Sequence, residues 1–144
     1  MEDSRIVEVL RSWIGTRWMH GVSVKGYRTD CAQFIVSVGK ELGWIGPEYK
    51  TPVYNRQVAL HENCALISAE LGKIPGLRRL MLPLESFRVG DIFVYQSGRG
   101  EGHVGMYAGN GRMIHCSVRR GVEEIRIDDL SLGWMVAAWR REAG

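Results

Sequence analysis

The fold is decided by the stretch Thr29-Asp30-Cys31-Ala32-Gln33-Phe34-Ile35. Asp30 is a favoured N-cap residue, because its carboxylate can accept a hydrogen bond from an unpaired N–H of a first helical turn. The apolar spacing that follows predicts a helix over 31–42, and Gly43 supplies its stop. Cys31 therefore occupies the first turn of a helix.

A cysteine at a helix N-terminus has the chemistry of a nucleophile. The thiolate is the attacking form, and the partial positive charge of the helix end predicts a lowered pKa for Cys31. The backbone N–H of Cys31 would also be placed to hold a developing oxyanion. The alternative is a buried core cysteine, for which no partners further along the chain are required.

Two histidines in the C-terminal half are candidate partners for this thiol. The alternating pattern predicts a hairpin of strands 103–108 and 112–117 around the glycine-rich turn 109–111. With a plain two-residue turn, His103 and His115 would point to opposite faces of the hairpin. A shared face requires a turn with an odd number of residues or a β-bulge, and the turn sequence permits a three-residue turn.

On a shared face, the two histidines would complete a cysteine-hydrolase site. His103 would take the proton of Cys31 and return it to a leaving amine. His115 would hydrogen-bond the other ring nitrogen of His103 and so fix its tautomer. Cys116, one residue on, would face the core.

The order of predicted elements favours an α+β fold, with N-terminal helices packed on an antiparallel sheet. Residues 15–29 and 97–102 are glycine-rich and are expected to be loops. The whole chain, 1–144, is expected to be one domain. Helices are predicted at 3–14, 31–42 and 54–71, and strands at 91–95, 103–108, 112–117, 122–127 and 134–139.

Composition argues against several classes of protein. A net charge of +3 is too small for a nucleic-acid binder. The chain has three cysteines, a small and odd number, which argues against a disulfide framework. Apolar runs are too short for a membrane span. The N-terminal Met-Glu-Asp-Ser-Arg precedes no apolar segment, so no encoded export signal is expected.

No metal or cofactor is expected either. His61 and Cys64 have a metal-like spacing, but two ligands do not make a zinc site, and helix packing is the preferred interpretation. His115 and Cys116 are adjacent on a predicted strand and would point to opposite faces, which makes them poor co-ligands.

These segments resemble the NlpC-type cell-wall cysteine peptidases, a papain-like family. That family shows Asp-Cys-Ser-Gly-Phe, then Gly-Asp, then His-Val-Gly-Ile-Tyr-x-Gly-x-Gly-x-x-Ile-His. The corresponding segments here are Asp30-Cys31-Ala32-Gln33-Phe34, Gly90-Asp91 and His103-Val104-Gly105-Met106-Tyr107-Ala108-Gly109-Asn110-Gly111-Arg112-Met113-Ile114-His115. The resemblance implies a papain-like fold with Cys31 as nucleophile, His103 as base and His115 as the third catalytic residue.

The resemblance also implies a substrate, the stem peptides of bacterial peptidoglycan, often cut between D-glutamate and the diamino acid. Substrate contacts are expected from Asp30 and from Trp18, which stands where the family usually has tyrosine. The missing export signal and the opening Trp13-Ile14-Gly15-Thr16 resemble the phage-borne branch. There, a catalytic domain made in the cytoplasm is delivered to the cell wall by a phage tail or similar particle, whose proteins are expected partners.

Two alternatives stay open at this point. The same three residues could serve an N-acetylmuramoyl-alanine amidase, or a peptidyl or acyl transferase, because a fold does not determine the bond that is attacked. The chain could also be a non-catalytic structural component of a tail.

Overall fold

The computed structural model describes residues 2–52, 54, 66–84, 86–128 and 134–142. The helices in these ranges are α1 (Glu2–Ser12), α2 (Cys31–Glu41) and α4 (Leu66–Leu71). The strands are β1 (Arg17–Trp18), β2 (Ser23–Val24), β3 (Arg28–Thr29), β4 (Leu77–Arg79), β5 (Ile92–Ser97), β6 (Gly100–Gly109), β7 (Arg112–Ser117), β8 (Gly121–Arg126) and β9 (Met135–Arg141). None of the described helices has an apolar stretch long enough to cross a bilayer.

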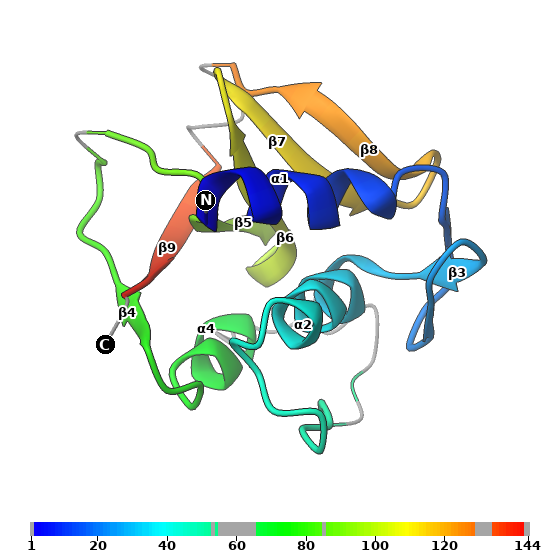
Figure 1. The fold of residues 1–144 in the computed structure, drawn as a ribbon. Coiled ribbons are helices and arrows are strands. Elements are labelled where there is room, and N and C mark those ends of the chain that lie inside the picture. Colours follow the sequence, from blue (N-terminus) through cyan, green and yellow to red (C-terminus); the bar gives the residue numbers. More distant parts are fainter. Residues whose placement is uncertain (1, 53, 55–65, 85, 129–133, 143–144) are drawn as a thin grey trace.

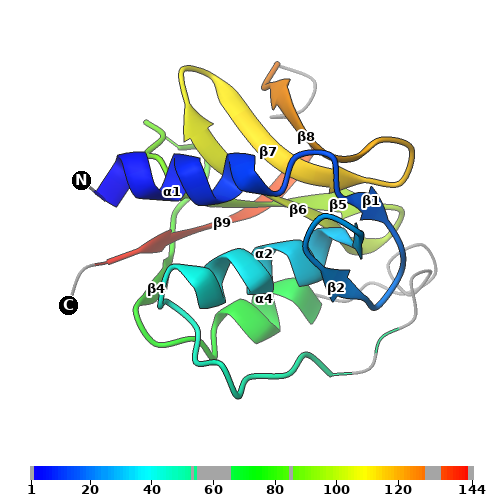
Figure 2. The ribbon, with the colours of Figure 1, turned by 45° about the vertical axis from the view of Figure 1, so that its right-hand side comes forward.

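One antiparallel sheet organises the molecule and confirms the predicted α+β class. Its strand order is β4-β9-β5-β6-β7-β8. The helices α1, α2 and α4 lie against one face of this sheet (Figures 1 and 2). The main hydrophobic core fills the space between them, with Leu10, Phe34 and Leu71 from the helices and Val104 and Ile114 from the strands.

The opposite face of the sheet carries a second, smaller core. Phe93, Tyr95 and Met113 are buried there, and Phe87 packs against them from the segment that precedes β5. Both faces are therefore covered, which explains why β5 is a run of apolar residues rather than an alternating one.

The segment 15–29, expected to be a loop, forms a second sheet of three very short strands in the order β1-β3-β2. Strands of two residues are too short to show an alternating pattern, so they could not be predicted from hydrophobic periodicity. Figure 2 shows this small sheet beside the N-terminal end of α2. Backbone hydrogen bonds of 3.2 Å from Gly15 N to Val122 O and 2.8 Å from Val122 N to Thr16 O hold its start against β8.

Two other predictions differ in extent from the structure. The loop expected over 97–102 is much shorter, because β6 already begins at Gly100. The helix predicted over 54–71 is present as α4 at its C-terminal end, while residues 55–65, with His61 and Cys64, lie outside the described residues.

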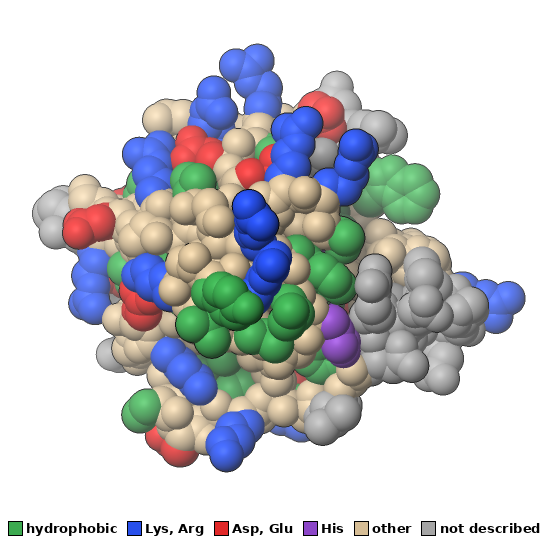
Figure 3. All heavy atoms as spheres, turned by 90° about the vertical axis from the view of Figure 1, so that its right-hand side faces the viewer, with side chains coloured by type: hydrophobic (Ala, Val, Ile, Leu, Met, Phe, Trp, Pro, Cys, Tyr) green, Lys and Arg blue, Asp and Glu red, His purple; other side chains and the backbone are tan. Residues whose placement is uncertain are grey.

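Hydrophobic side chains gather on the face of the molecule that carries the small sheet (Figure 3). Met19, Val24 and Tyr27 contribute exposed apolar surface from this segment. Isolated exposed apolar residues are ordinary, but the segment that carries these lies beside the N-terminal end of α2 (Figure 2).

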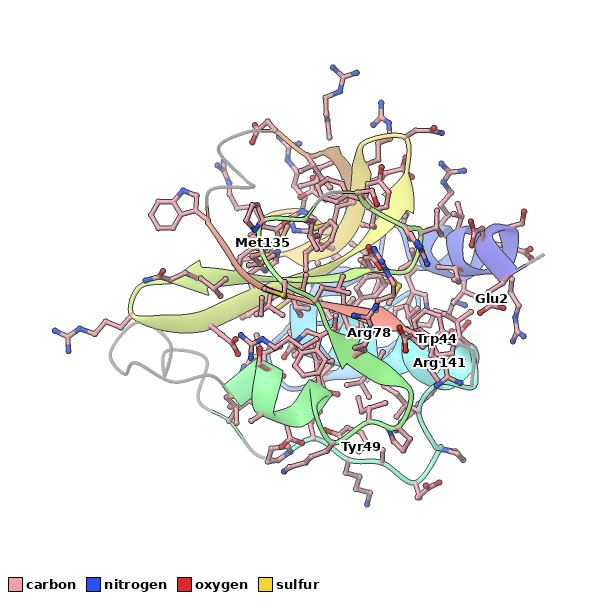
Figure 4. The ribbon with its side chains drawn as sticks, turned by 90° about the vertical axis from the view of Figure 1, so that its left-hand side faces the viewer. Glu2, Trp44, Tyr49, Arg78, Met135 and Arg141 are labelled. Carbon is pink, nitrogen blue, oxygen red and sulfur yellow. The ribbon has the colours of Figure 1, made fainter. Side chains whose placement is uncertain are left out.

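A buried ion pair holds the C-terminal strand to the sheet. Asp91 is fully buried, and its carboxylate accepts hydrogen bonds of 2.8 Å from both Nε and Nη2 of Arg140 and of 2.9 Å from Arg88 N. The Arg140 side chain is itself only 15% exposed. Figure 4 shows the same end of β9, where Arg141 lies near Arg78 of the edge strand β4 and far from Met135.

Replacing Arg140 by methionine should destabilise the fold by about 3–5 kcal/mol, because it leaves the Asp91 carboxylate buried without its cation. Urea unfolding measures the change. The matched control is Arg141→Met, since among the described residues the Arg141 side chain donates to a backbone oxygen, Pro75 O at 3.1 Å, and to no carboxylate. The control should lose about 1 kcal/mol or less. Equal losses in the two variants would contradict the assigned role of the pair.

Candidate functional site

The start of α2 is fixed by its N-cap, as predicted. Asp30 has an extended backbone, with φ −117° and ψ 179°, and its Oδ1 accepts a 2.8 Å hydrogen bond from Gln33 N. Cys31 is thereby the first helical residue, and its half-buried side chain carries a free thiol. The predicted position of the cysteine at a helix N-terminus is confirmed.

The second carboxylate oxygen of Asp30 accepts hydrogen bonds from two other segments that lie near the cysteine. Oδ2 accepts a 2.7 Å hydrogen bond from Gly21 N and another from the hydroxyl of Tyr54. His20 lies next to this group, with Nδ1 3.9 Å from Oδ2 and Nε2 3.0 Å from Tyr54 O. No partner for His20 and no role for Tyr54 was predicted from the sequence. Both residues make contacts with distant segments of the chain, and no sequence pattern predicts that these segments lie side by side.

His103 and His115 share one face of the sheet, as the site requires. His103 Nε2 lies 2.6 Å from His115 Nδ1, a hydrogen-bond distance. Tyr107 pairs with Met113 and Gly109 with Arg112, so the register shifts by one residue at Ala108. The turn itself is the plain two-residue form, and the bulge, rather than a three-residue turn, brings the rings together.

Gly105 makes room for the second histidine. It pairs directly with His115 across β6 and β7. A Cβ on Gly105 would lie 2.5 Å from Met113 Sδ and 3.1 Å from His115 Cβ. The absence of a side chain at Gly105 therefore leaves room for the side chains of Met113 and His115 on the neighbouring strand.

Cys116 faces the helices, as expected for the residue after His115. It is buried in the main core, and its thiol donates to Thr29 O at 3.4 Å. This contact ties β7 to the residue just before the N-cap of α2, so the cysteine and histidine segments are joined by a packed interior.

One cavity brings the predicted residues together. It has a volume of about 330 Å³, and its wall includes Trp18, Asp30, Cys31 and His103. His115 stands behind His103, as its hydrogen bond to that ring requires. The remaining wall is largely apolar and comes from α2 and α4, with Ile35, Val36, Ile67 and Leu71.

Glu101 is a cavity residue that sequence reasoning missed. It is buried, and its carboxylate accepts hydrogen bonds from Ser68 N at 2.7 Å and from Ser68 Oγ at 2.6 Å. Glu101 lies two residues before His103 on β6, so it fastens α4 to the strand that carries the histidine. Glu101 lies in the glycine-rich segment 97–102, which was predicted to be a loop, so no buried contact was expected for it.

Burial keeps the cysteine and the histidine neutral in the free protein. Burial first, and then the charge of Asp30, raises the pKa of the Cys31 thiol to about 12. The N–H groups of Val104, Ala32 and Cys31 lower this pKa but do not outweigh burial, so the lowered cysteine pKa expected from the helix end is wrong. Burial, with a smaller effect of His115, lowers the pKa of His103 to about 4.

Known proteins are similar to this chain in sequence and in fold. The Escherichia coli protein named murein DD-endopeptidase MepS/murein LD-carboxypeptidase is 29% identical over 119 residues, covering 83% of this chain and 52% of the relative. The chain thus spans about half the length of the curated relatives it matches.

Two solved structures show the same papain-like fold. An NlpC/P60 family protein from Bacillus cereus superposes with a TM-score of 0.63 and 21% identity, over 96% of this chain and 40% of that chain. RipD from Mycobacterium tuberculosis is described as a non-catalytic NlpC/p60 domain protein. It superposes with a TM-score of 0.56 and 16% identity, over 98% of this chain and 97% of that chain. The NlpC/P60 family model matches residues 15–140, and the chain belongs to this family.

Proposed function

We propose that this protein is a cysteine peptidase that hydrolyses an amide bond in the stem peptides of bacterial peptidoglycan. The observation that carries the proposal is one cavity lined by both Cys31 and His103, with His115 hydrogen-bonded to Nε2 of His103. Membership of the NlpC/P60 family and the name of the Escherichia coli relative, a murein endopeptidase, support the substrate class.

The pKa of the Cys31 thiol, which burial raises, and the pKa of His103, which burial lowers, support a general-base mechanism rather than a preformed ion pair. Cys31 Sγ attacks the scissile carbonyl carbon while His103 takes the thiol proton, so the thiolate forms only as it reacts. The N–H groups of the first turn of α2 donate to the oxyanion of the tetrahedral intermediate. His103 then gives its proton to the departing amine, which leaves a thioester on Cys31.

Hydrolysis of the thioester uses the same residues in reverse. His103 takes a proton from a water molecule, whose oxygen attacks the thioester carbonyl. Collapse of the second tetrahedral intermediate releases the carboxylic acid product and returns the proton to the sulfur. His115 keeps the His103 ring oriented in both halves of the reaction.

Within the stem peptide, we propose the bond between D-glutamate and the diamino acid. The Escherichia coli relative is named for DD-endopeptidase and LD-carboxypeptidase activities, which act on other amides of the same peptides. Mass spectrometry of digested peptidoglycan separates these cases, since each cut leaves different new termini. Delivery by a phage tail, and tail proteins as partners, remain predictions.

Changing Cys31 to alanine should reduce the release of soluble fragments from purified peptidoglycan by a factor of about 1,000 or more, because no thioester can form. Thermal unfolding should show an unchanged fold, since the half-buried side chain loses only its sulfur. Full lytic activity in this variant would overturn the proposal. Binding to peptidoglycan without any fragment release by the wild-type protein would place the chain with RipD-like binding proteins.

Alkylation of Cys31 by iodoacetamide should be slow at pH 7 and rise steadily through pH 9, roughly tenfold per pH unit, because the thiol pKa is about 12 and the thiolate is the reactive form. Peptide mass mapping separates Cys31 from the other two cysteines. A rate that is already constant between pH 5 and pH 8 would instead reveal a thiolate–imidazolium pair and contradict the neutral resting site.

A further inference from the structure

Three neighbouring strands present a row of polar side chains on one face of the sheet. His115 on β7 pairs directly with Glu123 on β8, and with Gly105 on β6. Because alternate residues of a strand share a face, His103 lies on this face together with Gly105. His115 Nε2 lies 3.4 Å from Glu123 Oε2, and the two side chains are 12% and 21% exposed.

We propose that Glu123 is a positioning residue that completes a relay from the sheet edge to the nucleophile. Its carboxylate sets the tautomer of His115, and through His115 that of His103. This inference rests on the proposed function, in which His103 is the base for Cys31.

The positions of the ring protons limit the tautomers that the two histidines can adopt. His103 Nε2 and His115 Nδ1 are 2.6 Å apart, so one of these nitrogens donates and the other accepts. His103 can receive a proton from Cys31 only at its remaining nitrogen, Nδ1, which requires its own proton to be on Nε2. His115 then accepts at Nδ1 and carries its proton on Nε2, the nitrogen that faces Glu123.

The opposite arrangement would disable the base. If His115 donated from Nδ1, His103 would carry its proton on Nδ1 and could accept nothing from the thiol. His115 Nε2 is buried, and the oxygen that faces it is Glu123 Oε2 at 3.4 Å. The carboxylate of Glu123 is the anion facing that nitrogen, so it favours the tautomer that keeps His103 active.

Glu123 also offsets the charge that appears during the reaction. Burial lowers the pKa of His115 and the nearby Glu123 carboxylate raises it, so the carboxylate favours positive charge on this side of the pair. Among the described residues, the charged and titratable groups that face these two rings are Glu123 from β8 and Tyr95 from β5, whose ring centroid lies 6.2 Å from that of His103. Arg120 Nη1 lies 3.9 Å from the other carboxylate oxygen of Glu123. Arg120 is 79% exposed, so solvent screens its effect.

The adjacent residue supplies a matched control. Glu124 is the next residue of β8 and points to the opposite face, where its Oε1 accepts a 3.0 Å hydrogen bond from Arg11 Nε. Glu123→Gln and Glu124→Gln therefore remove the same charge from the same strand, but only the first removes it from the histidine pair.

The test measures both kinetics and tautomers in the full-length protein. With soluble muropeptides as substrate, Glu123→Gln should lower kcat by about 10- to 100-fold with KM within about twofold, whereas Glu124→Gln should leave both unchanged. The acidic limb of the pH profile should move to lower pH in Glu123→Gln alone, because the carboxylate that raises the imidazole pKa is gone. Glu123→Asp, which keeps the charge, should recover part of kcat.

Histidine nitrogen NMR provides a readout that does not depend on turnover. The wild-type spectrum should show His115 protonated on Nε2, and Glu123→Gln should mix the two tautomers. A wild-type-like spectrum together with wild-type-like kcat in Glu123→Gln would overturn the relay while leaving the peptidase assignment standing. If the wild-type protein cleaves no muropeptide, the proposed function fails. In that case the NMR spectra still test the relay, and a His115 tautomer that stays on Nε2 in Glu123→Gln would overturn it.

Discussion

The site depends on the hydrogen bonds that Asp30 accepts. One oxygen caps α2 through Gln33 N and so determines that the helix begins at Cys31. The other oxygen accepts from Gly21 N and from the Tyr54 hydroxyl, which draws the small N-terminal sheet and the connector after α2 around the sulfur. A single buried carboxylate thus sets both the position of the nucleophile and the wall of its cavity. Its charge has a cost, because it opposes thiolate formation next door.

The raised pKa of Cys31 is one of two pKa shifts that determine the charge of the free site. The thiol and the imidazole are both held neutral, one by a raised pKa and the other by a lowered pKa, chiefly through burial. Charge is therefore created only in the reaction itself, when a substrate carbonyl is present to take the sulfur and first-turn N–H groups can hold the oxyanion. A low-dielectric cavity strengthens these interactions and keeps the unreacted thiol in its less reactive form.

The register of the sheet explains why His103, His115 and Glu123 lie next to one another. The bulge at Ala108 moves His103 and His115 onto one face, and Gly105 leaves room for the Met113 and His115 side chains. The pairing of β7 with β8 then determines which residue stands behind His115, and here it is the acidic residue Glu123. The order of side chains from Glu123 to His103 follows from strand register, so it resists disruption better than a site built on loops.

The sequence by itself determined the cap, the helix after it, the hairpin and the need for an irregular register, because these follow from local hydrogen bonding and from strand alternation. It also pointed to Cys31, His103 and His115. Only the tertiary structure decided the pKa of Cys31, the partners of His20 and Tyr54, the burial of Arg140 against Asp91, and the contact between His115 and Glu123. Those properties depend on how segments far apart in the chain exclude water from one another, and no local pattern encodes that.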